Sequence, residues 1–193
     1  MMRPRRALSS LHSFSVGVVP MSRVLTRAVL FVVMITAGAM LAAVAAHPAT
    51  HNIVKVSGYE PGTIVVKTGE RRLLYVIDRD RALRFPVGVG REGQQWLGRA
   101  KVEGKYIEPD WAPPDVIRRD HPNLPKVIPG GSPRNPMGAA ALTLRGGEYA
   151  IHGTNNPASI GGFVSYGCIR MLNADITDLY QRVSVGTTVV VTR

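Results

Sequence analysis

Short stretches in which apolar and polar residues alternate run through this chain, which is typical of β-strands rather than of long helices. Two of them, Thr63–Lys67 and Arg71–Asp78, flank a Thr-Gly-Glu turn and predict a β-hairpin. Residues 81–89 continue the alternation and predict a third strand, interrupted at Pro86. Residues 63–89 are therefore expected to form an antiparallel sheet.

The C-terminal part of the chain predicts three further strands and a helix. Residues 139–144 and 148–152 flank an Arg-Gly-Gly turn, and residues 187–192 form an apolar run after a glycine. Residues 173–183 have the period of an amphipathic helix, with Asn173 as the expected N-cap. The expected buried face of this helix consists of Ile176, Leu179, Tyr180 and Val183. The domain is therefore predicted to be mostly β, with one helix late in the chain.

Residues 90–138 show no persistent helical or strand period, and prolines concentrate between Pro109 and Pro136. A disordered linker would not normally carry Trp96 and Trp111. We interpret this segment as an ordered excursion that packs on the domain and borders a cleft. The alternative is a surface loop without a fixed structure.

The N-terminal segment, residues 1–46, carries arginines but no acidic residue and ends in an apolar run with small residues. This pattern predicts a cleaved secretory signal. The run is also long enough for an uncleaved membrane anchor. A start at Met21 would give a shorter signal of the same kind. We therefore expect the domain, residues 47–193, to lie in the periplasm or cell envelope, with membrane contact only through this segment.

The charge pattern narrows the partners of the domain. The formal net charge of the full chain is +11. No basic run is interleaved with aromatic residues, which argues against nucleic acid as a partner. A polyanionic envelope surface is compatible with this charge. The histidines are scattered and only one cysteine is present, so no zinc spacing occurs. We expect neither a metal nor a cofactor.

The single cysteine, Cys168, lies in the stretch Val164–Met171 and directly follows a glycine. One thiol cannot form an intrachain disulfide, so it is buried and inert, paired with another molecule, or functional. His152 ends a predicted strand 16 residues earlier, and glycines in the intervening loop allow it to fold back. A histidine within hydrogen-bonding distance would activate the thiol as a nucleophile.

The neighbours of Cys168 also fit acyl transfer. Backbone N–H groups at Tyr166, Gly167 and Cys168 can point at a developing oxyanion. The guanidinium of Arg170 can hold a carboxylate. Each residue also has a plainer interpretation, as a core side chain, a strand-end hydrogen bond or a surface ion pair. A cysteine and a histidine at this spacing, taken alone, would support the catalytic and the structural interpretation about equally.

The combined pattern is much more specific. Residues 151–154 (Ile-His-Gly-Thr), a glycine-rich loop and residues 165–173 (Ser-Tyr-Gly-Cys-Ile-Arg-Met-Leu-Asn) resemble the YkuD-type L,D-transpeptidase family, in its ErfK/YbiS-like periplasmic branch. The resemblance extends to residues 68–76, 83–93 and 135–144. It implies a YkuD-like β-sandwich of mixed sheets, with one helix after the cysteine.

The resemblance implies a role for each residue of the motif. Cys168 would be the acyl-enzyme nucleophile and His152 its general base, with the backbone of Gly153 orienting the imidazole. Amides around Gly167 and Cys168 would form the oxyanion hole. The residues expected to contact the peptide stem are Ser165, Tyr166 and Arg170. One position departs from the family, which often has histidine where this chain has Tyr166. Because His152 supplies the base, we expect activity to survive, with a phenol that donates a hydrogen bond or packs over the substrate.

The implied reaction is acyl transfer on peptidoglycan stem peptides. Cys168 attacks the carbonyl at the L-centre of the third stem residue, D-alanine leaves, and an amine of a second stem forms a 3→3 cross-link without a cofactor. A carbapenem should also acylate Cys168. The alternatives are a lipoprotein-anchoring transpeptidase, a hydrolase of the same fold or, at a greater distance, a secreted cysteine peptidase. The alternative from another class is a non-catalytic peptidoglycan-binding envelope protein.

Overall fold

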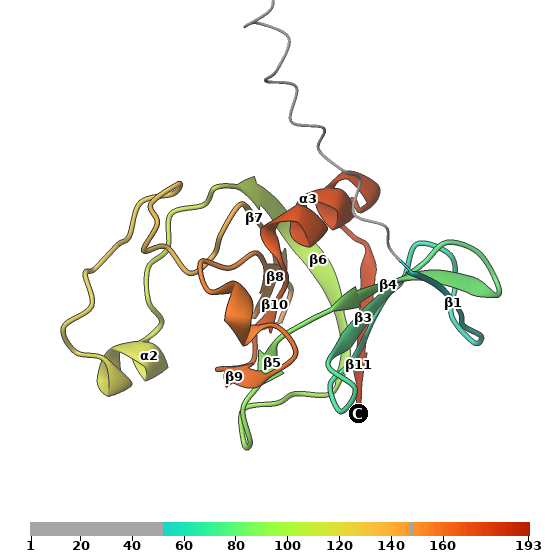
Figure 1. Ribbon diagram of the computed structural model, residues 1–193, viewed down its shortest axis with the longest axis horizontal. Helices are drawn as coiled ribbons and strands as arrows, with labels where there is room; N and C mark the ends of the chain where they lie inside the picture. Colours follow the sequence, from blue (N-terminus) through green and yellow to red (C-terminus); the bar gives the residue numbers. More distant parts are fainter. Residues whose placement is uncertain (1–51, 147–148) are drawn as a thin grey trace, which may run out of the picture. The chain divides into compact units, whose positions relative to one another are not determined.

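A computed structural model describes residues 52–146 and 149–193 (Figure 1). The predicted signal or anchor at residues 1–46, the alternative start at Met21 and the domain boundary at residue 47 lie outside the described residues. In the described part of the chain, no helix is both long enough and apolar enough to span a bilayer.

One large sheet and one small sheet make up the domain. The strands of the large sheet are β1 (Asn52–Lys55), β2 (Ile64–Lys67), β3 (Arg72–Val76), β4 (Arg81–Pro86), β6 (Gly98–Ile107), β7 (Ala140–Leu144), β8 (Ala150–His152), β10 (Ile169–Arg170) and β11 (Thr188–Thr192). Their order is β1-β4-β3-β2-β11-β6-β7-β8-β10. The small sheet pairs β5 (Val89–Gly90) with β9 (Phe163–Ser165). Because β11–β2 and β10–β8 are parallel and the neighbouring pairs antiparallel, the large sheet is mixed, as expected.

The long strand β6 joins the two halves of the large sheet. Its first part pairs with β11, and its second part pairs with β7 after a register shift between Val102 and Gly104. Apolar side chains from both halves meet in one core, for example Leu73 and Phe85 from the first half with Leu142 and Ile151 from the second. Two halves that share one core confirm the predicted β-sandwich.

The predicted hairpin and third strand are present as β2, β3 and β4, with Ile64 opposite Tyr75 in the β2–β3 ladder. The predicted late strands are present as β7, β8 and β11. The segment at residues 90–138 differs from the expectation, because it contains β6 and a short helix, α2 (Asp115–Asp120). Only Val102 of β6 is buried, so this strand has no apolar alternation that the sequence could reveal.

The predicted helix is α3 (Asn173–Arg182), which lies against the second half of the large sheet (Figure 1). Its predicted face is confirmed, because Ile176 and Leu179 are fully buried in the core. The predicted capping role of Asn173 is wrong, since Leu172 occupies the N-cap position without a side-chain bond. The Asn173 carboxamide oxygen accepts instead from the N–H groups of Ala139 and Thr154, at 3.1 and 3.0 Å. It therefore ties the segment after β8 to the start of β7.

Candidate active site

Two adjacent parallel strands, β8 and β10, bring the predicted histidine and cysteine together. Arg170 of β10 lies opposite His152 of β8 in the register. Since side chains alternate between the faces of a sheet, Cys168, Arg170 and His152 project on one face. The intervening Ile151 and Ile169 project into the core on the other face, where they are buried. The apolar-polar alternation in both motif segments therefore places the three predicted site residues on one face.

Strand β10 has only two residues but is fixed along both edges. The backbones of Gly88 and Arg170 exchange two hydrogen bonds, of 2.9 and 2.8 Å. On the other edge, the Met171 N–H donates to the carbonyl of His152 at 2.8 Å. These bonds hold the residues after Cys168 in a fixed place relative to His152.

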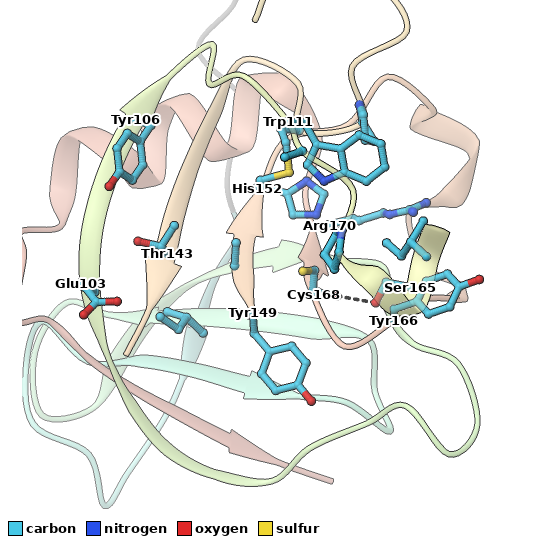
Figure 2. A pocket seen from close by; sticks show the side chains of 17 residues that line it. Glu103, Tyr106, Trp111, Thr143, Tyr149, His152, Ser165, Tyr166, Cys168 and Arg170 are labelled. Atoms are coloured by element: carbon cyan, nitrogen blue, oxygen red, sulfur yellow. Dashed lines mark hydrogen bonds between the residues drawn. The ribbon is translucent and has the colours of Figure 1, made fainter. Parts of the chain in front are cut away.

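Cys168, His152 and Arg170 lie next to one another in a pocket of about 440 Å³ (Figure 2). That volume is within the range of small-molecule sites. Glu103, Tyr106 and Thr143 line its far end (Figure 2). The excursion contributes Trp111, Ala112, Pro114, Ile117 and Pro136 to the lining. This confirms the expectation that residues 90–138 border a cleft.

The excursion is held by its own hydrogen bonds. The side-chain amide of Asn135 donates to the carbonyls of Pro109, Ile128 and Pro129, at 2.9 to 3.1 Å. The backbones of Trp111 and Ile128 also exchange two hydrogen bonds. Because these bonds connect residues 109–111 with residues 128–135, this part of the excursion forms a structured wall of the pocket.

His152 is buried, with 4% of its surface exposed. Its Nδ1 lies 2.7 Å from the carbonyl oxygen of Gly153. Because a carbonyl can only accept, Nδ1 carries the proton in this contact and Nε2 of the neutral ring keeps its lone pair. Burial, followed by the positive charge of Arg170, lowers the pKa of His152 to about 4. The carbonyls of Gly153 and Pro136 act in the opposite direction but do not offset burial. The ring is therefore an unprotonated base at neutral pH.

Burial also raises the pKa of the Cys168 thiol above its ordinary value. A backbone hydrogen bond with Ala150 and the charge of Arg170 lower it by less. The site at rest therefore holds a neutral thiol beside a neutral imidazole, because both charged forms are disfavoured by loss of solvent. A nucleophilic attack by such a thiol would require transfer of its proton to a base such as the imidazole.

The turn before Cys168 is built around Ser165. The Ser165 hydroxyl donates to the carbonyl of Cys168 at 2.6 Å and accepts from the Gly167 N–H at 3.1 Å. The Gly167 N–H, expected in the oxyanion hole, therefore already has an acceptor inside the turn. The Ser165 hydroxyl, expected to contact substrate, makes its bonds there too. Among the described residues, the N–H groups of Tyr166 and Cys168 have no protein acceptor.

Arg170 lines the pocket together with His152 and Cys168. Its Nε is buried and has no hydrogen-bond partner among residues 52–146 and 149–193. Burial lowers the pKa of its guanidinium, although that group stays charged at neutral pH. A buried donor without an acceptor is costly in a folded protein. This cation is therefore available to an anionic or carbonyl group in the pocket.

Tyr166 connects the motif to the excursion. Its hydroxyl donates to the Asp120 carboxylate at the end of α2. The Arg91 guanidinium bonds the same carboxylate at 3.1 Å and lies 3.9 Å above the Tyr166 ring. The hydrogen bond to Tyr166, followed by that to Arg91, lowers the pKa of Asp120, so the carboxylate is ionised at neutral pH. Sequence reasoning missed Arg91 and Asp120, since each is an ordinary charged residue in a polar segment.

Trp96 also contacts the turn before Cys168. Its Nε1–H donates to the carbonyl of Gly167 at 3.1 Å. Its ring stacks on Tyr149, with centroids 5.3 Å apart and planes 4° from parallel. The sequence indicated only that Trp96 belongs to an ordered segment. A tryptophan in a short polar loop is the one sequence feature that could have indicated its contact with the cysteine turn.

In the described part of the chain, His, Cys, Asp and Glu side chains do not gather in groups of three or more that could hold a metal ion.

Comparison with known proteins identifies the same region. The YkuD model, described as the L,D-transpeptidase catalytic domain, matches residues 61–191. The probable L,D-transpeptidase ErfK/SrfK of Escherichia coli (strain K12) is 42% identical over 135 residues, which cover 65% of this chain and 42% of that protein. The probable L,D-transpeptidase YbiS of the same strain is 40% identical over 135 residues, covering 65% of this chain and 43% of that protein. The chain spans less than half the length of these two relatives.

Solved structures share the fold. One is L,D-transpeptidase 3 from Mycobacterium tuberculosis in complex with a faropenem-derived adduct, with a TM-score of 0.53 and 15% identity. The match covers 68% of this chain and 60% of that one. At this identity the likeness bears on the fold of the domain.

Proposed function

The chain belongs to the YkuD family of L,D-transpeptidase catalytic domains, and from this premise we propose that it is a peptidoglycan L,D-transpeptidase with Cys168 as its nucleophile. One observation carries the proposal. The Cys168 thiol and the unprotonated His152 ring share one face of two neighbouring strands, inside a pocket of about 440 Å³. A thiol, a base and an open pocket are the minimum that cysteine acyl transfer needs.

In the first step, Sγ of Cys168 attacks the carbonyl carbon at the L-centre of the third stem residue. Nε2 of His152 accepts the thiol proton, while the bond from Nδ1–H to Gly153 keeps the ring oriented. The N–H of Cys168 donates to the developing oxyanion. The C–N bond then breaks, His152 returns the proton to the leaving amine, and D-alanine departs. A thioester on Cys168 remains.

In the second step, an amine of another stem attacks the thioester. His152 takes a proton from this amine and passes it to sulfur as the C–S bond breaks, so the thiol is regenerated and a 3→3 cross-link forms. The walls of Trp111, Pro114 and Ile117 reduce the access of water, which competes with the amine. A lipoprotein lysine or water as the acceptor would give the anchoring or hydrolytic variant of the same chemistry.

Arg170 is the substrate-binding residue of this proposal. It lines the same pocket as Cys168, its buried Nε has no partner among the described residues, and its guanidinium can bond a carboxylate or carbonyl of the donor stem. The N-terminal segment, with its signal-like pattern, supports export of residues 47–193 to the periplasm or cell envelope, where stem peptides are found.

The proposal is tested with purified Cys168→Ala and His152→Ala on a tetrapeptide donor and an amine acceptor, with products identified by mass spectrometry. We expect both variants to fold and to lose transfer by at least about a thousandfold, because nucleophile and base act as a unit. Mass spectrometry of the intact protein should find a carbapenem adduct on the wild type and none on Cys168→Ala. A normal 3→3 product from Cys168→Ala, or a folded wild type that forms no adduct, would overturn the mechanism.

A further inference from the structure

We propose that Trp96, supported by Tyr149, is a positioning residue that aims the N–H of Cys168 at the oxyanion of the acylation intermediate. This inference rests on the proposed function and adds a device that orients its oxyanion hole. Neither aromatic residue belongs to the cysteine motif, and neither needs to touch the reacting atoms.

The Gly167–Cys168 peptide plane is held at its carbonyl oxygen. Trp96 Nε1–H donates to the carbonyl oxygen of Gly167 at 3.1 Å. The Gly167–Cys168 peptide is trans, so its carbonyl and its N–H point in opposite directions. Fixing the carbonyl on the indole therefore turns the Cys168 N–H away from Trp96. That N–H has no protein acceptor among the described residues, and Cys168 itself lines the pocket.

The indole is itself held in place. It stacks on Tyr149 with centroids 5.3 Å apart, and both rings pack against the main core. Tyr149 directly precedes β8, the strand that carries His152. The same stack therefore links the strand of the base to the turn of the nucleophile.

Gly167 lies too close to Tyr149 for a residue with a side chain. Its φ is +115°, which side chains rarely adopt, and a Cβ there would lie 2.3 Å from Cε1 of Tyr149. Only glycine therefore fits at this position, in close contact with the Tyr149 ring. With Ser165 holding the Gly167 N–H and Trp96 holding its carbonyl, both polar groups of Gly167 are fixed. The direction of the next N–H is then fixed as well.

Two reactions at the same sulfur separate positioning from a purely structural role. Acylation by imipenem passes through an oxyanion, whereas alkylation by iodoacetamide displaces iodide from a methylene carbon and forms none. A structural role of Trp96 predicts that both rates change together. The positioning role predicts that only acylation slows, since only that reaction uses the Cys168 N–H.

The test variant is Trp96→Phe, which keeps a ring on Tyr149 but removes the N–H donor. We expect its saturating rate of imipenem acylation to fall about tenfold or more, since losing a true oxyanion donor costs 10²–10³ and this change only misaligns one. Alkylation should stay within about twofold of wild type. The matched control is Tyr75→Phe, which removes another aromatic donor to a carbonyl, from Tyr75 to Arg182 at 3.1 Å, away from the pocket. Both of its rates should equal those of wild type.

Two results with Trp96→Phe would contradict the positioning role. Equal acylation by Trp96→Phe and wild type, or a parallel loss of acylation and alkylation, would overturn the inference and leave the proposed function standing. A wild type that imipenem does not acylate would instead overturn the proposed function. If Trp96→Phe does not fold by circular dichroism, benzothienylalanine at position 96 keeps the indole shape without the N–H, and the same selective loss is expected.

Discussion

At the scale of single residues, the titration of His152 sets how the reaction depends on pH. Burial, then Arg170, lowers its pKa to about 4, and burial raises the pKa of the Cys168 thiol. The pair of neutral thiol and neutral imidazole therefore persists from just above pH 4 through neutral pH. We expect the rate of imipenem acylation to be level from about pH 5 to about pH 8 and to fall only near pH 4. An acid limb near pH 6.5, measured by mass spectrometry of quenched samples, would show that the ring titrates like an exposed histidine.

The same shift makes the stability of the fold depend on pH. His152 has an ordinary pKa of 6.5 and a pKa of about 4 in the folded protein, so the unfolded chain binds the proton more readily. The stabilising effect of the neutral ring is complete above about pH 6.5 and is lost as the pH falls toward 4. Between pH 7 and 4.5 we expect the free energy of unfolding to fall by about 2–3 kcal/mol more in wild type than in His152→Gln. Urea titrations of both proteins at both pH values measure this difference, and equal losses would contradict it.

At the scale of elements, Tyr166 fastens α2 and the surrounding excursion to the cysteine turn. Tyr166→Phe removes the hydrogen bond to Asp120 but keeps the ring under Arg91. Because this contact is solvent-exposed, we expect a moderate effect, a few-fold higher KM for the donor stem with kcat little changed. Limited proteolysis should also cut residues 109–136 faster. Tyr59→Phe, in the other half of the domain, is the control and should change neither measurement; an unchanged KM in Tyr166→Phe would refute the fastening role.

The same elements show how far the sequence could predict the fold. The hairpin of β2 and β3 was predictable because both strands alternate and a glycine turn separates them. Strand β6 was not, because pairing on both edges holds it while most of its side chains face solvent. The Asn173 cap failed for a related reason, since tertiary partners bind the carboxamide more favourably than its own helix does.

The candidate site also has one part that the sequence could predict and one part that it could not. Cys168 and His152 could be placed together from the motif, because two short strands and a glycine-rich loop bring them to one face. The contacts that shape the turn could not be predicted, because they join distant parts of the chain. Trp96 and Gly167 are 71 residues apart, and Asp120 and Tyr166 are 46 apart. Neither pair produces a local pattern that periodicity or spacing would reveal.

At the scale of the whole molecule, the shared core predicts that the described part of the domain unfolds as one unit. Leu73 of β3 and Leu142 of β7 are both fully buried in that core, although they belong to different halves of the large sheet. Leu73→Ala and Leu142→Ala should each lower the free energy of unfolding by about 2–5 kcal/mol, because each leaves a cavity. If the two halves of the large sheet unfold as one cooperative unit, each variant also shifts the unfolding transition by the same amount for every spectroscopic probe.

Two probes report on different parts of the domain. The fluorescence of Trp96 and Trp111 reports on the pocket half, whereas far-ultraviolet circular dichroism reports on all strands. We expect the two urea transitions to coincide in wild type and in both alanine variants. Separate transitions, with Leu73→Ala shifting only the circular dichroism, would mean that the first half can melt while the pocket stays intact. Coincident transitions would mean that the geometry of Cys168 and His152 depends on packing throughout the domain, including strands that never touch the pocket.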